Sequence, residues 1–173
     1  MTRIGYIRFK SKQPVDDLLA ACVAALQKRL VHIAGAIQAS PEECIDCSGA
    51  LNLRDVEDGA VFNFSQDLGA GSDGCALDPQ ALAAISQRIT NALERTPQLA
   101  VINRFGKAEA DGHGLRSVIE RAMLADIPLL VAVREDFEQD WSAFHGGMAE
   151  RLPLDEAVVL AWCEDVIAST PSP

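Results

Sequence analysis

The segment Leu99–Gly114, LAVINRFGKAEADGHG, decides the fold class of this chain. Its first four residues form an apolar run typical of a buried strand, and the chain then enters a polar, charged turn. Open α/β sheets bind their ligands where strands end in such turns. The turn combines two cations, a carboxylate and an amide, which belong to Asn103, Arg104, Lys107 and Glu109. We therefore predict a site for a small anion at this strand end.

Strands and helices alternate along the rest of the chain. Apolar runs predict strands at Arg3–Phe9, Val31–Gln38, Leu99–Ile102 and Leu129–Val133, and a hairpin at Leu51–Val56 and Ala60–Phe64. Helical spacing predicts helices near Val15–Leu30, Asp78–Pro97, Leu115–Ala125, Phe137–Phe144 and Asp155–Ala168. The alternation indicates an α/β fold, with a mostly parallel sheet of about five strands, helices on both faces and a small hairpin. Gly35, inside the second strand, indicates a close backbone approach.

Length and composition limit the possible functions. With 173 residues, the chain is expected to form one domain over residues 1–168, followed by a disordered tail at 169–173. No stretch is apolar for long enough to cross a bilayer, and the N-terminal residues lack the apolar core of a signal peptide. We therefore predict a cytoplasmic protein without a membrane partner. The net charge of −10 argues against nucleic-acid binding.

The segment after the first strand lacks the phosphate-binding pattern GxxxxGKS/T. It reads GYIRFKSKQPVDDLL, and an ordinary loop with solvated lysines is the simpler interpretation. The run NRFGKAE nevertheless resembles the Walker-B region of small P-loop nucleoside triphosphatases. Asn103 stands where the metal-organising Asp would be, and Arg104 replaces the next acid. The pattern is kept by Gly106, Lys107 and Glu109. Asn and Arg do not hold Mg²⁺ as carboxylates do, which argues against hydrolysis.

From about Ile4 to Leu152, the chain also resembles an uncharacterised bacterial domain family. Members of that family are often encoded near molybdate-transport or molybdenum-enzyme genes. The likeness lies in GAIQ (Gly35–Gln38), SQDLGAGSDGCALD (Ser65–Asp78), NRFGKAEADGHGLR (Asn103–Arg116), IPLLVAV (Ile127–Val133) and WSAFHGG (Trp141–Gly147). The resemblance implies a P-loop-like α/β fold without an intact Walker A loop, and a link to molybdenum. It implies no established activity.

The glycine-rich loop before Asp78 is a second candidate site. Its glycines expose backbone amides that form a nest for an oxyanion ahead of a helix. The candidate ligand-binding residues in this loop are Ser65, Gly69, Gly71, Gly74 and Cys75. Against this interpretation, the loop also carries acidic residues, and glycine-rich loops are usually only turns.

Histidine and cysteine give weaker signals. His113 lies between two glycines of the 99–114 turn and is the histidine best placed to meet a ligand there. Cys44 and Cys47 form a single CxxC, whereas a structural zinc site needs about four protein ligands. We interpret them as incidental loop cysteines, and metal binding or redox activity stays open. Cys22 and Cys163 lie on apolar helix faces and are expected in the core.

These observations predict a binding protein rather than an enzyme. The ligand would be molybdate, tungstate, a phosphate-like oxyanion or the phosphate of a nucleotide, in a role linked to molybdenum metabolism. Arg104 and Lys107 would neutralise the ligand, and Glu109 would orient them. Hydrogen bonds would come from Asn103 and from the amides around Gly71 and Gly74.

Two alternatives belong to other classes. A divergent nucleoside triphosphatase would use Lys10 or Lys12 in place of the P-loop lysine, with Glu109 placing water or metal. A scaffold or regulator of a molybdenum enzyme or transporter would dock through the apolar face of the last helix, Val158–Ile167, and the chain would also be able to form homo-oligomers.

Overall fold

The β-sheet is the centre of the molecule, and the computed structural model describes residues 2–40, 52–64 and 78–170. Within these residues, seven strands form one sheet in the order β4-β3-β2-β5-β6-β1-β7. The strands are β1 (Ile4–Phe9), β2 (Ile33–Gln38), β3 (Asn52–Asp55), β4 (Val61–Asn63), β5 (Leu99–Phe105), β6 (Leu129–Arg134) and β7 (Ala149–Leu152). The predicted α/β fold with a mostly parallel sheet is confirmed, but the expectation of about five strands is corrected to seven.

Two features account for the larger sheet. The predicted hairpin joins it, because β3 pairs antiparallel with β2 and β4 pairs antiparallel with β3. The sequence does not predict β7, which pairs parallel with β1 at the sheet edge. Its four residues include the exposed Glu150 and Arg151, and short, charged edge strands carry little apolar pattern.

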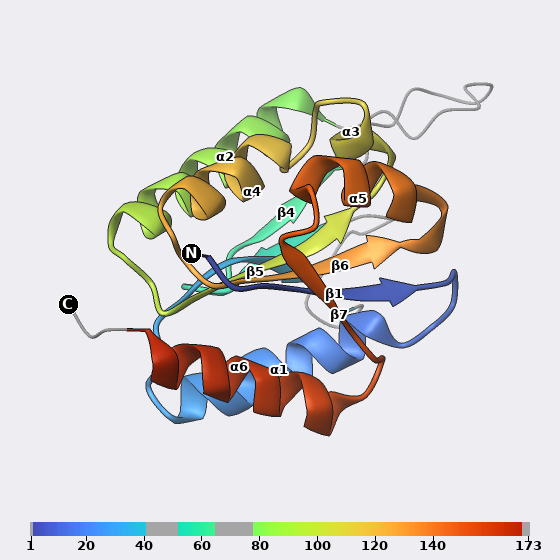
Figure 1. Cartoon of the computed structure of the whole chain (residues 1–173). Coiled ribbons are helices and arrows are strands. Elements are labelled where there is room, and N and C mark those ends of the chain that lie inside the picture. The colour runs from blue at the N-terminus through green and yellow to red at the C-terminus, as the bar shows by residue number, and fades with distance from the viewer. Residues whose placement is uncertain (1, 41–51, 65–77, 171–173) are drawn as a thin grey trace.

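The connections around β1 and β6 create a crevice at one end of the sheet. The chain leaves β1 through α1 (Val15–Lys28) on one face and returns at β2 (Figure 1). It leaves β6 through the short 3₁₀ helix η2 (Glu135–Phe137) and α5 (Glu138–His145) on the opposite face and returns at β7. Because β1 and β6 are neighbours whose connections run in opposite directions, their carboxyl ends frame a topological switch point.

Helices cover both faces of the sheet, and each face has its own apolar core (Figure 1). One face is covered by α1 and α6 (Glu156–Ser169). The other is covered by α2 (Pro79–Glu94), α3 (Lys107–Ala110), α4 (Arg116–Leu124) and α5. Among the described residues, no helix is both long enough and apolar enough to span a membrane.

The last helix, α6, uses most of its apolar face inside its own chain. Val159, Trp162 and Val166 are buried, whereas Val158 is 44% exposed. Burial in its own core therefore accounts for most of the surface that a docking partner was expected to cover. The helix extends through Ser169, which is the first residue of the stretch expected to be a disordered tail.

Close packing between strands and helices matches two expectations from the sequence. Gly35 has φ +128°, and a Cβ atom there would lie 1.9 Å from the carbonyl oxygen of Val101, which confirms the close backbone approach between β2 and β5. Cys22 and Cys163 are free and buried. Burial raises the thiol pKa of Cys22 to about 11 and that of Cys163 to about 12, so both behave as core residues.

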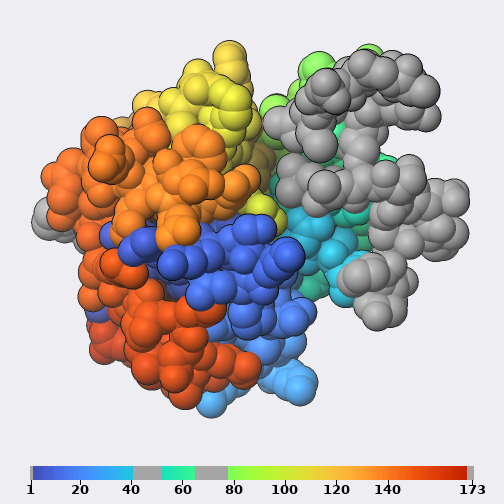
Figure 2. Space-filling view, turned by 90° about the vertical axis from the view of Figure 1, so that its right-hand side faces the viewer, coloured from blue at the N-terminus to red at the C-terminus, as the bar shows by residue number. Residues whose placement is uncertain are grey.

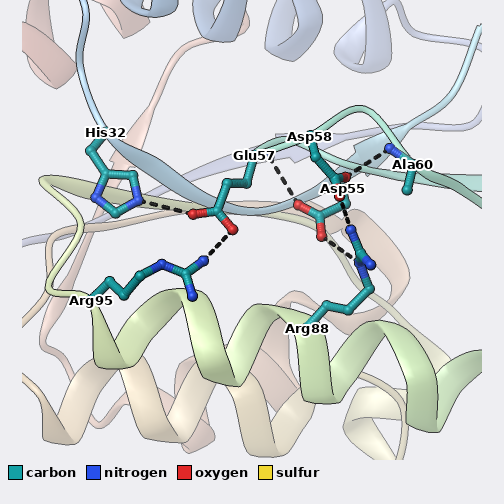
Figure 3. A network of polar contacts seen from close by, with 7 residues as sticks. All are labelled: His32, Asp55, Glu57, Asp58, Ala60, Arg88 and Arg95. Carbon is teal, nitrogen blue, oxygen red and sulfur yellow. Dashed lines mark hydrogen bonds and ion pairs between the residues drawn. The ribbon is translucent and has the colours of Figure 1, made fainter.

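A polar network fastens the β3–β4 hairpin to α2 (Figure 3). Its side chains belong to His32, Asp55, Glu57, Asp58, Arg88 and Arg95. Nε of Arg88 donates to the buried Asp55 at 2.9 Å, and the same guanidinium pairs with Asp58. Glu57 accepts from Arg95 and lies 3.2 Å from the ring of His32. The hairpin is therefore held to the sheet by backbone pairing and to α2 by charge.

Candidate functional site

A cavity of about 410 Å³ opens at the carboxyl edge of the sheet, next to the switch point of β1 and β6. Figure 2 views this edge, where the blue segment after β1 lies beside the orange segment after β6. The cavity is lined by Phe9, residues 11–17, Arg104 and Arg134. Open α/β folds bind ligands in such crevices, so this cavity is the candidate functional site.

An irregularity in β5 places Arg104 in the cavity wall. The strand continues three residues beyond its predicted end, so Asn103, Arg104 and Phe105 belong to the strand rather than to the turn. The pairing register of β5 on β6 shifts between Asn103 and Phe105, which leaves Arg104 as the extra residue. Such bulges redirect side chains near sites. The guanidinium of Arg104 lies 5.3 Å from the ring centre of Phe9, the last residue of β1.

Asn103 connects the end of β5 to the first turn of α1. It is 1% exposed, and its Nδ2 donates a hydrogen bond to Oδ1 of Asp16 at 2.6 Å. The Arg104 guanidinium lies 4.0 Å from the same oxygen. Asn103 was predicted to donate to a ligand, but in the structure its amide group holds a carboxylate that lines the cavity.

Two further cations line the cavity: Arg134, which the sequence did not assign to a site, and Lys12, which was named only in the nucleoside triphosphatase alternative. Arg134, the last residue of β6, pairs with Asp136 at 2.7 Å. Lys12 lies in the β1–α1 loop with φ +70°, a left-handed conformation that costs a non-glycine residue roughly 1–2 kcal/mol. Lys10 is not among the residues that line the cavity, and its Nζ lies 3.9 Å from the Glu135 carboxylate. Of the two loop lysines, Lys12 is therefore the one in the cavity wall.

The Glu109 carboxylate forms its hydrogen bonds with backbone N–H groups, and of the two cations it was predicted to orient, Arg104 attracts it only weakly by charge. Glu109 is 7% exposed, and its carboxylate accepts the N–H groups of Gly106 and Leu115, each at 3.0 Å. The bond to Gly106, which precedes α3, is half of a capping box. Burial raises the pKa of Glu109, while the hydrogen bonds from Leu115 and Gly106 lower it and leave a net rise. Glu109 thus closes the turn between β5 and α4.

Lys107 and His113 lie on exposed surface outside the cavity lining. The side chain of Lys107 is 77% exposed, and its Nζ donates to Asp111 at 2.8 Å. That hydrogen bond raises the pKa of Lys107. The structure therefore separates the two predicted cations: Arg104 lines the cavity, whereas Lys107 pairs with its own helix turn.

The glycine-rich candidate loop lies outside the described residues. This applies to Ser65, Gly69, Gly71, Gly74 and Cys75, and also to Cys44 and Cys47. The helix that follows the loop is described, and the side chain of Asp78 accepts the N–H of Gln80 as the predicted N-cap of α2. Within the described ranges, no group of three or more His, Cys, Asp or Glu side chains is arranged to hold a metal ion.

Two solved structures share this architecture over almost the whole chain. One is described as "Solution Structure of a Human Cancer-Related Nucleoside Triphosphatase", with a TM-score of 0.65 and 12% identity over 97% of each chain. The other is THEP1 from the hyperthermophile Aquifex aeolicus, with a TM-score of 0.63 and 13% identity over 98% of each chain. The chain therefore shares the α/β fold of these two structures.

The chain belongs to the family described as "Protein of unknown function (DUF2478)", which matches residues 4–162. It is also 32% identical over 163 residues to a protein of Bradyrhizobium diazoefficiens named "Molybdenum import ATP-binding protein ModC 2". The aligned region covers 94% of this chain but 18% of that relative. The chain thus spans less than a fifth of the length of the curated relative.

Proposed function

We propose that this chain binds a small oxyanion, or the phosphate of a nucleotide, in the cavity at the carboxyl edge of the sheet, without hydrolysing it. One observation carries the proposal: Lys12, from the loop after β1, and Arg104 and Arg134, from the ends of the neighbouring strands β5 and β6, line one cavity. Guanidinium groups form paired, charge-assisted hydrogen bonds with oxyanions, and an ammonium group acts as a point charge. Ser11 adds a hydroxyl, and the first turn of α1 forms part of the wall.

The absence of hydrolysis is argued from the residues that meet the ligand. The β1–α1 loop, KSKQP, contains neither glycine nor the GKS/T sequence that places phosphate and Mg²⁺ in P-loop enzymes. The end of β5 offers Asn103 and Arg104 where a carboxylate would hold the metal. Glu109 is occupied by two backbone N–H groups. One relative is named as a molybdenum import ATP-binding protein, so we include molybdate and ATP in the test panel, with tungstate and phosphate as their analogues. The link to molybdenum metabolism is part of the proposal.

Isothermal titration of the chain with these four anions tests the proposal. We expect heat of binding from at least one of them. Arg104→Gln is expected to weaken that binding by roughly tenfold or more, because it removes a charge-assisted hydrogen bond. Lys107→Gln removes a cation three residues away, outside the cavity, and is the matched control that is expected to bind as the original chain does.

Three results would contradict the proposal in different ways. No heat from any of the four anions, with a folded sample, rejects the binding site. Equal weakening by Arg104→Gln and Lys107→Gln rejects the cavity as its location. Release of phosphate from ATP that depends on Mg²⁺ and is lost in Lys12→Gln rejects the absence of hydrolysis and selects the divergent nucleoside triphosphatase instead.

A further inference from the structure

A carboxylate lies among the cations of the proposed site. Asp16, in the first turn of α1, lines the cavity, and its side chain is 41% exposed. Its Oδ1 accepts from Asn103 at 2.6 Å and lies 4.0 Å from the Arg104 guanidinium. These contacts hold the Asp16 carboxylate in the cavity wall through Oδ1.

A carboxylate discriminates between oxyanions by their protons. An ionised carboxylate only accepts hydrogen bonds, so it stabilises a neighbour that donates one and repels an anion that carries none. Phosphate and arsenate keep at least one proton at neutral pH, whereas molybdate, tungstate and sulfate are fully deprotonated. The cavity that holds Asp16 is also lined by three cations, Lys12, Arg104 and Arg134, and by a second carboxylate, Asp17.

We infer that Asp16 makes the site selective for oxyanions that carry a proton, namely inorganic phosphate or the protonated terminal phosphate of a nucleotide, and that it excludes molybdate, tungstate and sulfate. The inference rests on the proposed function and names the ligand class of that same cavity. Asp16 accepts the ligand's O–H, while the three cations bind its remaining oxygens. A site built to pair with a ligand hydroxyl rejects an analogue that lacks it, because the polar group of the site is left without a partner.

Titration calorimetry at pH 7 with matched pairs of anions tests the inference. Phosphate and arsenate are expected to bind at least about tenfold more tightly than molybdate and sulfate. ADP and AMP, titrated without Mg²⁺ at pH 5.5 beside phosphate at the same pH, distinguish a nucleotide from free phosphate as the source of the group, because the second pKa of such a phosphate group is about 6 and most terminal phosphates are then protonated. Tighter binding of the nucleotides than of phosphate assigns the group to a nucleotide, and the reverse order assigns it to the free anion.

Asp16→Asn is the decisive variant. Asparagine keeps an oxygen that accepts from Asn103, and it replaces Oδ2 with an N–H₂ donor. The ratio of phosphate affinity to molybdate affinity is therefore expected to fall by about tenfold or more. Asp17→Asn removes the same charge from the same helix turn, and we expect it to raise both affinities by a similar factor. Thermal melting of each variant establishes that it is folded.

The outcomes separate this inference from the proposed function. If phosphate and molybdate bind the original chain equally well, or if Asp16→Asn changes both affinities by the same factor, the role of Asp16 is rejected while the site stands. If no oxyanion binds, the site itself is rejected.

Discussion

At the scale of one residue, Glu109 shows that a side chain in a functional-looking motif can instead accept hydrogen bonds from the backbone and stabilise a turn. The run NRFGKAE marks this glutamate as part of a site, yet its carboxylate accepts two backbone N–H groups across the turn that follows β5. Gly114, with φ +60°, packs so closely on it that a Cβ atom there would lie 2.1 Å from Oε1 of Glu109. Gly114 therefore leaves room for a buried carboxylate.

Glu109→Gln is predicted to lower the free energy of unfolding by roughly 1–3 kcal/mol, because one buried N–H then faces an amide N–H₂ instead of an oxygen. Glu109→Ala is expected to cost more, since both N–H groups lose their acceptor. Urea unfolding followed by circular dichroism measures the change. Lys107→Gln, on the exposed side of the same short helix, is the control, with an expected change below about 0.5 kcal/mol. Unchanged unfolding midpoints in both Glu109 variants would rule out this role.

At the scale of elements, local sequence signals predict helices well, but they do not predict strand segments that form by pairing with distant parts of the chain. Asp78 and Pro79 predict the start of α2, and in the structure Asp78 is the N-cap of that helix. The end of β5 and the whole of β7 escape prediction, because they gain strand geometry from pairing with β6 and β1. Neither segment has a hydrophobic periodicity of its own that indicates this pairing.

The same limit applies to the candidate site. Arg104 was predicted as a binding residue because it follows an apolar run, and it does line the cavity. Lys12 and Arg134 also follow apolar runs, but their convergence on Arg104 depends on the order β5-β6-β1 in the sheet. Strand order is set by how the connections cross the sheet, and a single sequence does not state it. Lys107, which the motif favoured, is turned away by the short helix α3.

Gly35→Ala tests the contact between β2 and β5. We expect it to destabilise the chain by on the order of 3 kcal/mol or more, because φ +128° is strained for alanine and the new methyl group collides with the Val101 carbonyl. Gly59→Ala is the matched control. Gly59 also has a positive φ, +79°, but nothing lies within 4 Å of its Cβ position, so only about 1 kcal/mol of backbone strain is expected. Thermal and urea unfolding measure both variants, and equal losses would contradict a steric role for the Val101 carbonyl.

At the scale of the whole molecule, ion pairs hold the antiparallel edge of the sheet, β3 and β4, to α2. The hydrogen bond from Arg95, with a smaller contribution from His32, lowers the pKa of Glu57. The backbone N–H of Ala60 and then Arg88 lower the pKa of Asp58. Carboxylates with folded-state pKa values below the unfolded ones stabilise the fold above the unfolded pKa, and that stability is lost as pH falls through the folded pKa. Glu109 acts in the opposite sense, because its pKa is raised.

The free energy of unfolding is therefore predicted to fall as the pH is lowered below the ordinary carboxyl range, near about 4. Arg95→Gln is expected to flatten this fall, since Glu57 then loses the main cause of its lowered pKa. Arg121→Gln breaks an exposed ion pair with Glu94 and serves as a control that keeps the original slope. Urea titrations at a series of pH values provide the slopes. If Arg95→Gln and the original chain have the same slope, the hairpin network does not carry the acid sensitivity.

The position of β1 has a consequence for how the chain is made. Ile4 pairs with Leu129 in β6 and with Ala149 in β7, so the earliest of the described strands lies between two late ones. A nascent chain leaving the ribosome must therefore carry β1 without either neighbour until β6 has been translated through Arg134, and with one open edge until translation has passed Leu152. During that interval the apolar side chains of β1 lack the contacts with β6 and β7 and are exposed to chaperones and proteases.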